Sequence, residues 1–195
     1  PMAVLINLAS ASASEIYSAA IQDYERGIII GSTTTGKGTA QVQLDTLAHG
    51  QATLTQRKFY RVTGGSTQNK GVIPDIKLVD IYNEEFGERK SKNALKWDTI
   101  PTAPFKRAGS TQPYVAKLSQ ASAQRTLADS QFKYLEARTA INKKSADQKK
   151  VVLDIDQRRA ELMDLEKQTL AVENQRRVAT GQVPYANWES YQASI

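Results

Sequence analysis

The sequence predicts an α/β fold in residues 1–80, followed by an α-helical carboxy-terminal extension. Two observations indicate this: short apolar runs alternate with a helix-forming segment early in the chain, and residues 114–180 contain neither glycine nor proline. The chain has 195 residues, 40% of them hydrophobic, which is enough for one domain with a packed core and an appendage.

The elements of the first region follow from periodicity and turn residues. Residues 4–6 and 27–31 are apolar runs typical of buried strands, and residues 39–44 alternate as a half-buried strand does. Residues 52–55 and 58–62 are also strand-like and lead into the glycine-containing residues 63–67, which predicts a hairpin or a long loop. Between the first two strands, residues 15–24 have helical composition, with an expected inner face of Ile16, Ala19, Ala20 and Ile21.

A polar linker is expected over residues 81–113, because glycines and prolines interrupt this stretch repeatedly. The composition of residues 114–195 then predicts helices, with Ile155, Leu162 and Leu165 among the apolar residues at helical spacing. Gly181 and Pro184 are stop signals. Two interpretations stay open: a solvated helical pair that buries one stripe, or a surface that binds a partner or a second copy.

Composition excludes several function classes. The chain has no cysteine, which removes disulfides, thiolate nucleophiles and thiolate metal sites. Its single histidine, His49, excludes any histidine-dependent triad that is not built around that residue. We expect neither a metal nor another cofactor. The net charge of +6 arises from 26 basic residues interspersed with 20 acidic ones, which argues against nucleic acid as a partner. No apolar run reaches the roughly 20 residues of a membrane span.

Residues 31–37 match the glycine and lysine spacing of a phosphate-binding loop after a strand. The match then fails at Gly38, where the loop chemistry requires a serine or threonine hydroxyl for the magnesium ion. A strand rather than a helix is also expected to follow. Nucleotide binding is therefore the weaker interpretation of these residues.

A second candidate is the run of small residues around Ser12, between a predicted strand and a predicted helix. A serine at a helix start has a backbone amide and the positive helix end beside it, which suits an oxyanion. With no cysteine and one histidine, the base that activates this serine would be a lysine, and Lys37 between two glycines is the best placed. By spacing alone, a serine before a helix is usually a cap and a lysine between glycines is usually an exposed turn residue, so both of these interpretations stay open.

These residues carry a resemblance to a known family. The catalytic segment of the tail-specific (carboxy-terminal processing) proteases resembles three stretches here: residues 10–16, 22–24 and 36–41. The segment that follows it in bacterial members is similar to residues 58–76. The resemblance implies a partial crotonase/Clp-protease-like catalytic core and cleavage of proteins near their carboxy termini by a serine and lysine pair.

The resemblance also implies roles for individual residues. The nucleophile falls on Ser12, the general base on Lys37, one oxyanion amide on Ala13, and a glutamine that orients the base on Gln41. Asp23 matches an acidic position of the family. A helix that starts at Ser12 would carry Asp23 about 16 Å along its axis, so we expect a structural or indirect role. His49, beside a glycine, is expected to be a loop residue.

Partners and location are implied by the family alone. The expected partners are polypeptide substrates with unstructured carboxy termini, and an adaptor protein or a second copy bound by the helical extension. The expected location is the periplasm. The chain opens with Pro1 directly onto an apolar run, which predicts a piece of a longer protein. Because the family's other oxyanion donor lies upstream, this piece alone is expected to be inactive.

Overall fold

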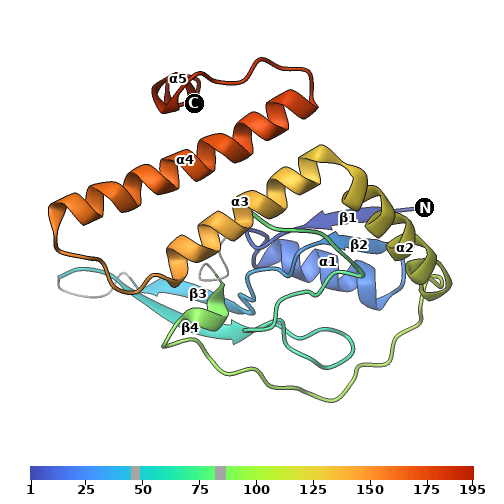
Figure 1. Cartoon of the computed structure of the whole chain (residues 1–195). Coiled ribbons are helices and arrows are strands. Elements are labelled where there is room, and N and C mark those ends of the chain that lie inside the picture. Colours follow the sequence, from blue (N-terminus) through green and yellow to red (C-terminus); the bar gives the residue numbers. More distant parts are fainter. Residues whose placement is uncertain (45–48, 82–86) are drawn as a thin grey trace. The chain divides into compact units, whose positions relative to one another are not determined.

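The computed structural model describes residues 1–44, 49–81 and 87–195 (Figure 1). By its internal packing, the chain divides into two compact units, Pro1–Gln120 and Ala121–Ile195. The predicted fold class, an α/β region followed by a helical extension, is confirmed. The predicted divisions near residues 80 and 114 stay predictions, and residues 82–86 of the expected linker lie outside the described residues.

A parallel sheet with the strand order β1-β2-β5 lies in the first unit. The helix α1 (Ala13–Asp23) connects the first two strands, as a parallel pair requires a crossover. The strands are β1 (Ala3–Ile6), β2 (Ile28–Gly31) and β5 (Ile76–Lys77). Ile6, Ile29 and Val72 form a buried cluster with Ala19 of α1, so the strand predicted at residues 4–6 ends in the core.

The face that α1 buries differs from the predicted one. Ala19 is buried, but Ile16 and Ala20 are exposed, whereas Glu15 and Ser18 are fully buried. The prediction was right for Ala19 and for Ile21, which packs against the core, and wrong for Ile16 and Ala20, because it weighed hydrophobicity alone. Hydrogen bonds to the Glu15 carboxylate offset the cost of removing it from water.

An antiparallel pair, β3 (Thr39–Leu44) and β4 (Ala52–Lys58), forms a separate two-stranded sheet. Its register shifts between Ala40 and Gln41, which is a β-bulge. The separate strand predicted over residues 58–62 is wrong, because β4 ends at Lys58. The chain then turns back, with the Arg61 amide donating to Gly65 O at 2.8 Å. A short 3₁₀ helix, η2 (Glu88–Lys90), follows β5.

Helices make up the rest of the chain: α2 (Gln112–Ala128), α3 (Ser130–Asp147), α4 (Ile155–Ala179) and α5 (Trp188–Gln192). The boundary between the two units falls within α2. In the second unit α4 packs against α3 and α5. Among the described helices, none has both the length and the apolarity that a membrane span requires.

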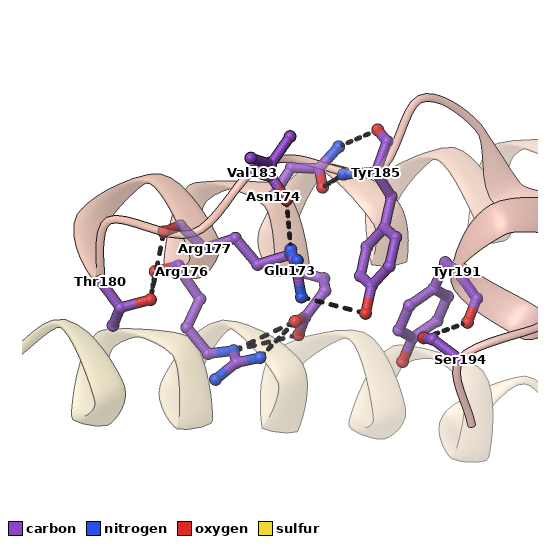
Figure 2. Close-up of polar contacts among 9 residues, drawn as sticks. All are labelled: Glu173, Asn174, Arg176, Arg177, Thr180, Val183, Tyr185, Tyr191 and Ser194. Atoms are coloured by element: carbon purple, nitrogen blue, oxygen red, sulfur yellow. Dashed lines mark hydrogen bonds and ion pairs between the residues drawn. The ribbon is translucent and has the colours of Figure 1, made fainter.

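The helix α4 buries polar residues where the sequence predicted apolar ones. Thr169 and Glu173 are buried, whereas Ile155 and Leu162 are exposed and Leu165 is half-buried. Arg176 holds the Glu173 carboxylate, with its Nε 3.2 Å from both oxygens (Figure 2). Burial by itself raises the pKa of Glu173, but hydrogen bonds from Arg176 and Tyr134 and the Arg176 charge outweigh it, so the pKa lies below its ordinary value.

The segment after α4 folds back along this helix (Figure 2). The Asn174 side-chain amide pairs with the Tyr185 backbone, donating to its carbonyl at 2.9 Å and accepting from its amide at 2.8 Å. Arg177 donates through Nε to Val183 O at 2.6 Å. Side chains of α4 thus satisfy the backbone of an extended segment that has no sheet partner.

Candidate active site

Ser12 lies in the connection from β1 to α1 and is the residue directly before the helix. Its backbone has φ 56° and ψ −112°, a conformation that residues other than glycine rarely adopt. Strain of this kind concentrates at functional sites, and a sharp strand-to-helix turn is how other hydrolases expose a nucleophilic serine. The backbone therefore favours the nucleophile interpretation of Ser12 over that of a simple cap.

The Ala13 amide directly follows Ser12 at the start of α1. Ala13 is exposed and is the first residue of the 11-residue helix α1. The Ser14 amide donates to Ala11 O at 3.3 Å, and the amides of Glu15 and Ile16 donate to Ser12 O at 2.9 and 3.0 Å. No residue in the described part of the chain accepts a hydrogen bond from the Ala13 amide, which leaves it available beside Ser12 at the positive end of the helix.

The buried carboxylate of Glu15 joins the turn at Ser12 to the loop that carries Lys37. Its Oε2 accepts from the amides of both Ser12 and Lys37, each at 2.9 Å. Its Oε1 accepts from the Gly36 amide at 2.7 Å and from the hydroxyl of buried Thr34. The backbone nitrogens of Ser12 and Lys37 are consequently no more than two hydrogen-bond lengths apart, although the residues lie 25 positions apart in the sequence.

The glycines around Lys37 let this loop approach other backbone closely. A Cβ on Gly38 would lie 2.5 Å from the Gln68 nitrogen, and Gly36 has a φ of +87°. The Gly38 amide donates to Gln68 Oε1 at 2.8 Å, and the Asn69 amide donates to Gly36 O at 2.8 Å. Lys37 is half-buried within this framework.

The Glu15 carboxylate connects the backbones of Ser12 and Lys37, but their side chains are not directly connected. Among the hydrogen bonds of the described residues, none connects Ser12 Oγ with Lys37 Nζ. Gln41 is exposed on β3, beyond the bulge, and donates to Thr55 Oγ1 at 3.3 Å. The bulge interrupts the strand alternation that the sequence predicted over residues 39–44.

Asp23 lies near the other end of α1 from Ser12 and is ion-paired with Arg61. The two distances from Arg61 are 3.0 Å from Nε to Oδ2 and 2.5 Å from Nη2 to Oδ1. This ion pair connects α1 with the turn after β4. His49 is exposed, in a bend of the chain.

The phosphate-loop interpretation conflicts with the geometry. The amides of Gly36 and Lys37, which would have to bind a phosphate, already donate to the Glu15 carboxylate. The strand β3 follows, not a helix.

Glu15, Thr34 and Gln68 are the site residues that sequence reasoning missed. The spacing of Ser12 and Glu15 fits a capping box, a signal that could have revealed the bond to the Ser12 amide. No local pattern predicts the bonds from Glu15 to Gly36 and Lys37.

Two family models match this chain. Residues 1–78 match the model of peptidase family S41, and residues 81–194 match that of the C-terminal domain of tail specific protease. The chain belongs to the tail-specific protease family. Together the two matches cover residues 1–78 and 81–194.

Similar proteins include tail-specific and carboxy-terminal-processing proteases. The tail-specific protease of Haemophilus influenzae is 42% identical over 171 residues, covering 81% of this chain and 24% of that protein. The carboxy-terminal-processing protease of Bartonella bacilliformis is 45% identical over 86 residues, covering 44% of this chain and 20% of that protein. The solved photosystem II D1 C-terminal processing protease is 38% identical over 40% of this chain and 20% of its own, with a TM-score of 0.37. The chain thus spans a quarter or less of the length of these relatives.

Proposed function

We propose that this chain supplies the nucleophile and the general base of a serine endopeptidase that cleaves polypeptides near their carboxy termini. Ser12 is the nucleophile and Lys37 the base. The observation that carries the proposal is the Glu15 carboxylate, which binds the backbones of Ser12 and Lys37 through one oxygen. A base and a nucleophile that act together need a shared, rigid support, because small displacements of reacting groups cost large factors in rate.

The chemistry is acyl transfer in two steps. Ser12 Oγ attacks the scissile carbonyl carbon while its proton passes to Lys37 Nζ, and the oxyanion that forms accepts a hydrogen bond from the Ala13 amide. The carbon–nitrogen bond then breaks, Lys37 returns the proton to the leaving amine, and an acyl ester remains on Ser12. Water hydrolyses this ester, again with Lys37 as base.

Gln41 and Asp23 act at a distance from the reacting atoms in this proposal. Gln41 supports the start of β3, directly after the Lys37 loop, and Asp23 supports the turn at Arg61. The hydrogen bond between Ser12 and Lys37 forms when substrate binds, because catalytic hydrogen bonds are often long or poorly aligned before that point.

Substrates, partners and location follow the family and are part of the proposal. Substrates have unstructured carboxy termini, and the enzyme works in the periplasm. The helical unit associates with an adaptor or a second copy, since apolar side chains such as Leu153 (95% exposed) and Met163 (67% exposed) are uncovered there. Size-exclusion mass measurements on Met163→Glu and Leu153→Glu variants test this: an unchanged mass and unchanged adaptor binding in both would contradict it.

The catalytic proposal is tested in the polypeptide that naturally contains this sequence, which is called the native polypeptide below. Ser12→Ala and Lys37→Ala should each abolish hydrolysis of an unstructured peptide while the melting temperature stays close to that of the unchanged protein. Lys37→Arg should fail as well, because a guanidinium does not lose its proton. Normal turnover by any of the three variants would contradict the dyad.

A further inference from the structure

Residues 87–103, which we call the strap, are connected by hydrogen bonds to residues 34–35 and 62–69 of the same compact unit. The Ile100 amide, for example, donates to Gly64 O at 2.9 Å. The strap lies in the region that matches the C-terminal domain of tail specific protease, whereas the residues that it contacts match peptidase family S41. The boundary between the two family matches is therefore not a boundary in the structure.

The 3₁₀ helix η2, at the start of the strap, binds the backbone just before Lys37. The Glu88 amide donates to Thr35 O at 2.9 Å, and Arg89 Nη2 donates to Thr34 O at 3.1 Å. These two carbonyls belong to residues two and three positions before Lys37. The strap therefore restrains the backbone that leads into the proposed general base.

Gln68 connects the strap to the residue after Lys37. Its side chain is fully buried, its Oε1 accepts from the Gly38 amide at 2.8 Å, and its Nε2 donates to Glu88 Oε1 at 3.2 Å. An amide side chain has one acceptor oxygen and one donor nitrogen, so only this orientation fits a backbone donor at one end and a carboxylate at the other. We call Gly38, Gln68 and Glu88 the relay.

The relay completes the set of bonds that hold the backbone around Lys37. Glu15 accepts from the amides of Gly36 and Lys37. Gln68 accepts from the next amide, that of Gly38, so buried side chains bind three consecutive amides. A Cβ on Gly38 would lie 2.5 Å from the Gln68 nitrogen, an approach that only glycine permits. The Lys37 side chain consequently projects from a backbone whose position depends on both Glu15 and Gln68.

Glu88 is the half-buried end of the relay. Of the residues that the structure describes, Gln68 alone donates a hydrogen bond to the Glu88 carboxylate. A fully buried amide is unfavourable unless its nitrogen has an acceptor. The carboxylate supplies this acceptor and so fixes the Gln68 side chain in the orientation that binds Gly38.

We propose that Gln68 and Glu88 are positioning residues for the general base: through the Gly38 amide they hold the Lys37 loop in the geometry that proton transfer from Ser12 requires. The start of the region that matches the C-terminal domain is then part of the machinery that cleaves the peptide bond. This inference rests on the proposed function, in which Lys37 is the base, and adds two residues that act through its backbone.

An exchange of the two side chains tests the relay in the native polypeptide. Gln68→Glu still accepts from Gly38 but sets a carboxylate against Glu88, and kcat should fall by about a hundredfold, the effect of a displacement near 1 Å. Glu88→Gln keeps an acceptor oxygen for Gln68 and should leave kcat within about threefold. The double variant restores both hydrogen bonds with donor and acceptor reversed, so its kcat should exceed that of Gln68→Glu by about tenfold or more.

Two further measurements separate positioning from a purely structural role. KM for an unstructured peptide should change little, and a small fluorophosphonate, which makes few substrate contacts, should modify Ser12 more slowly in proportion to the fall in kcat. Glu88→Ala, at a half-buried position, is the second variant should Gln68→Glu fail to fold, and its kcat should fall by about tenfold because Gln68 loses its acceptor. Gln120→Glu, at an exposed position of α2, is the control and should change neither kcat nor the rate of modification.

The outcomes also separate this inference from the proposed function. If Ser12→Ala or Lys37→Ala still cleaves peptide, the proposed function fails, whatever the relay variants do. If both are inactive but Gln68→Glu and Glu88→Ala keep normal kcat and normal Ser12 modification, with or without a loss of stability, the relay does not position Lys37. A double variant no better than Gln68→Glu, or a Glu88→Gln variant as slow as Glu88→Ala, would likewise overturn the inference.

Discussion

Replacing Glu15 with glutamine puts an amide nitrogen where one carboxylate oxygen now accepts hydrogen bonds. Each carboxylate oxygen accepts two hydrogen bonds, so the change removes two of the four. The two N–H donors of the new amide group then face the two donors that had bound the replaced oxygen, and these groups repel each other. A hydrogen bond to a charged group contributes about 1.5–3 kcal/mol, and two such losses amount to roughly 3–6 kcal/mol. Typical domains are stable by only about 5–15 kcal/mol, so the effect is large.

Activity should fall together with stability, because the same carboxylate positions Ser12 and Lys37. We expect kcat for an unstructured peptide to fall by about a hundredfold or more in Glu15→Gln, since a displacement near 1 Å has that effect. Urea unfolding and peptide hydrolysis by the native polypeptide provide the two measurements. Glu136→Gln, an exposed glutamate on α3, is the matched control and should change neither.

Glu15→Asp distinguishes bridging from charge. Aspartate keeps the negative charge and can still cap α1, but its side chain is one methylene shorter and cannot reach both the Ser12 turn and the Gly36 loop. It should therefore keep more stability than Glu15→Gln and still lose activity. Full activity in Glu15→Asp, or a stability change under about 1 kcal/mol in Glu15→Gln, would refute the reasoning.

Three further predictions concern the native polypeptide. The lowered pKa of Glu173 means that its contribution to stability is complete above the ordinary value of 4.5 and is lost as the pH falls through the folded pKa. Hydrogen exchange of α4 peptides should accelerate at that acidic end, and Glu173→Gln should remove the pH dependence; an equal dependence in the variant would count against it. Asp23→Asn should lower the free energy of unfolding by about 3 kcal/mol, because it breaks a largely buried ion pair, yet leave measurable hydrolysis, unlike Ser12→Ala. Complete inactivity with unchanged stability would show a direct catalytic role. Asn174→Ala should free the segment around Tyr185, seen as faster proteolytic cleavage there, and unaltered cleavage would show that other contacts hold it.

Local sequence signals determined much of the first unit. Apolar runs bounded by glycines identified the strands at residues 4–6 and 27–31, and small residues before a helical segment identified the turn at Ser12. Such signals succeed because strand formation, helix formation and tight turns depend on neighbouring residues. The resemblance to tail-specific proteases supplied the family and the candidate roles of Ser12 and Lys37.

Only the tertiary structure revealed what holds those two residues together. A glutamate in a helix is ordinarily solvated, and nothing near Glu15 in the sequence indicates that donors 19 to 22 positions away would surround its carboxylate. The same limitation placed Ile16 in the core, although it is exposed. Burial depends on which segments meet in space, and polar groups are buried where distant donors satisfy them. Composition along the chain therefore determined the helices and strands. Long-range hydrogen bonds decided the arrangement of the site.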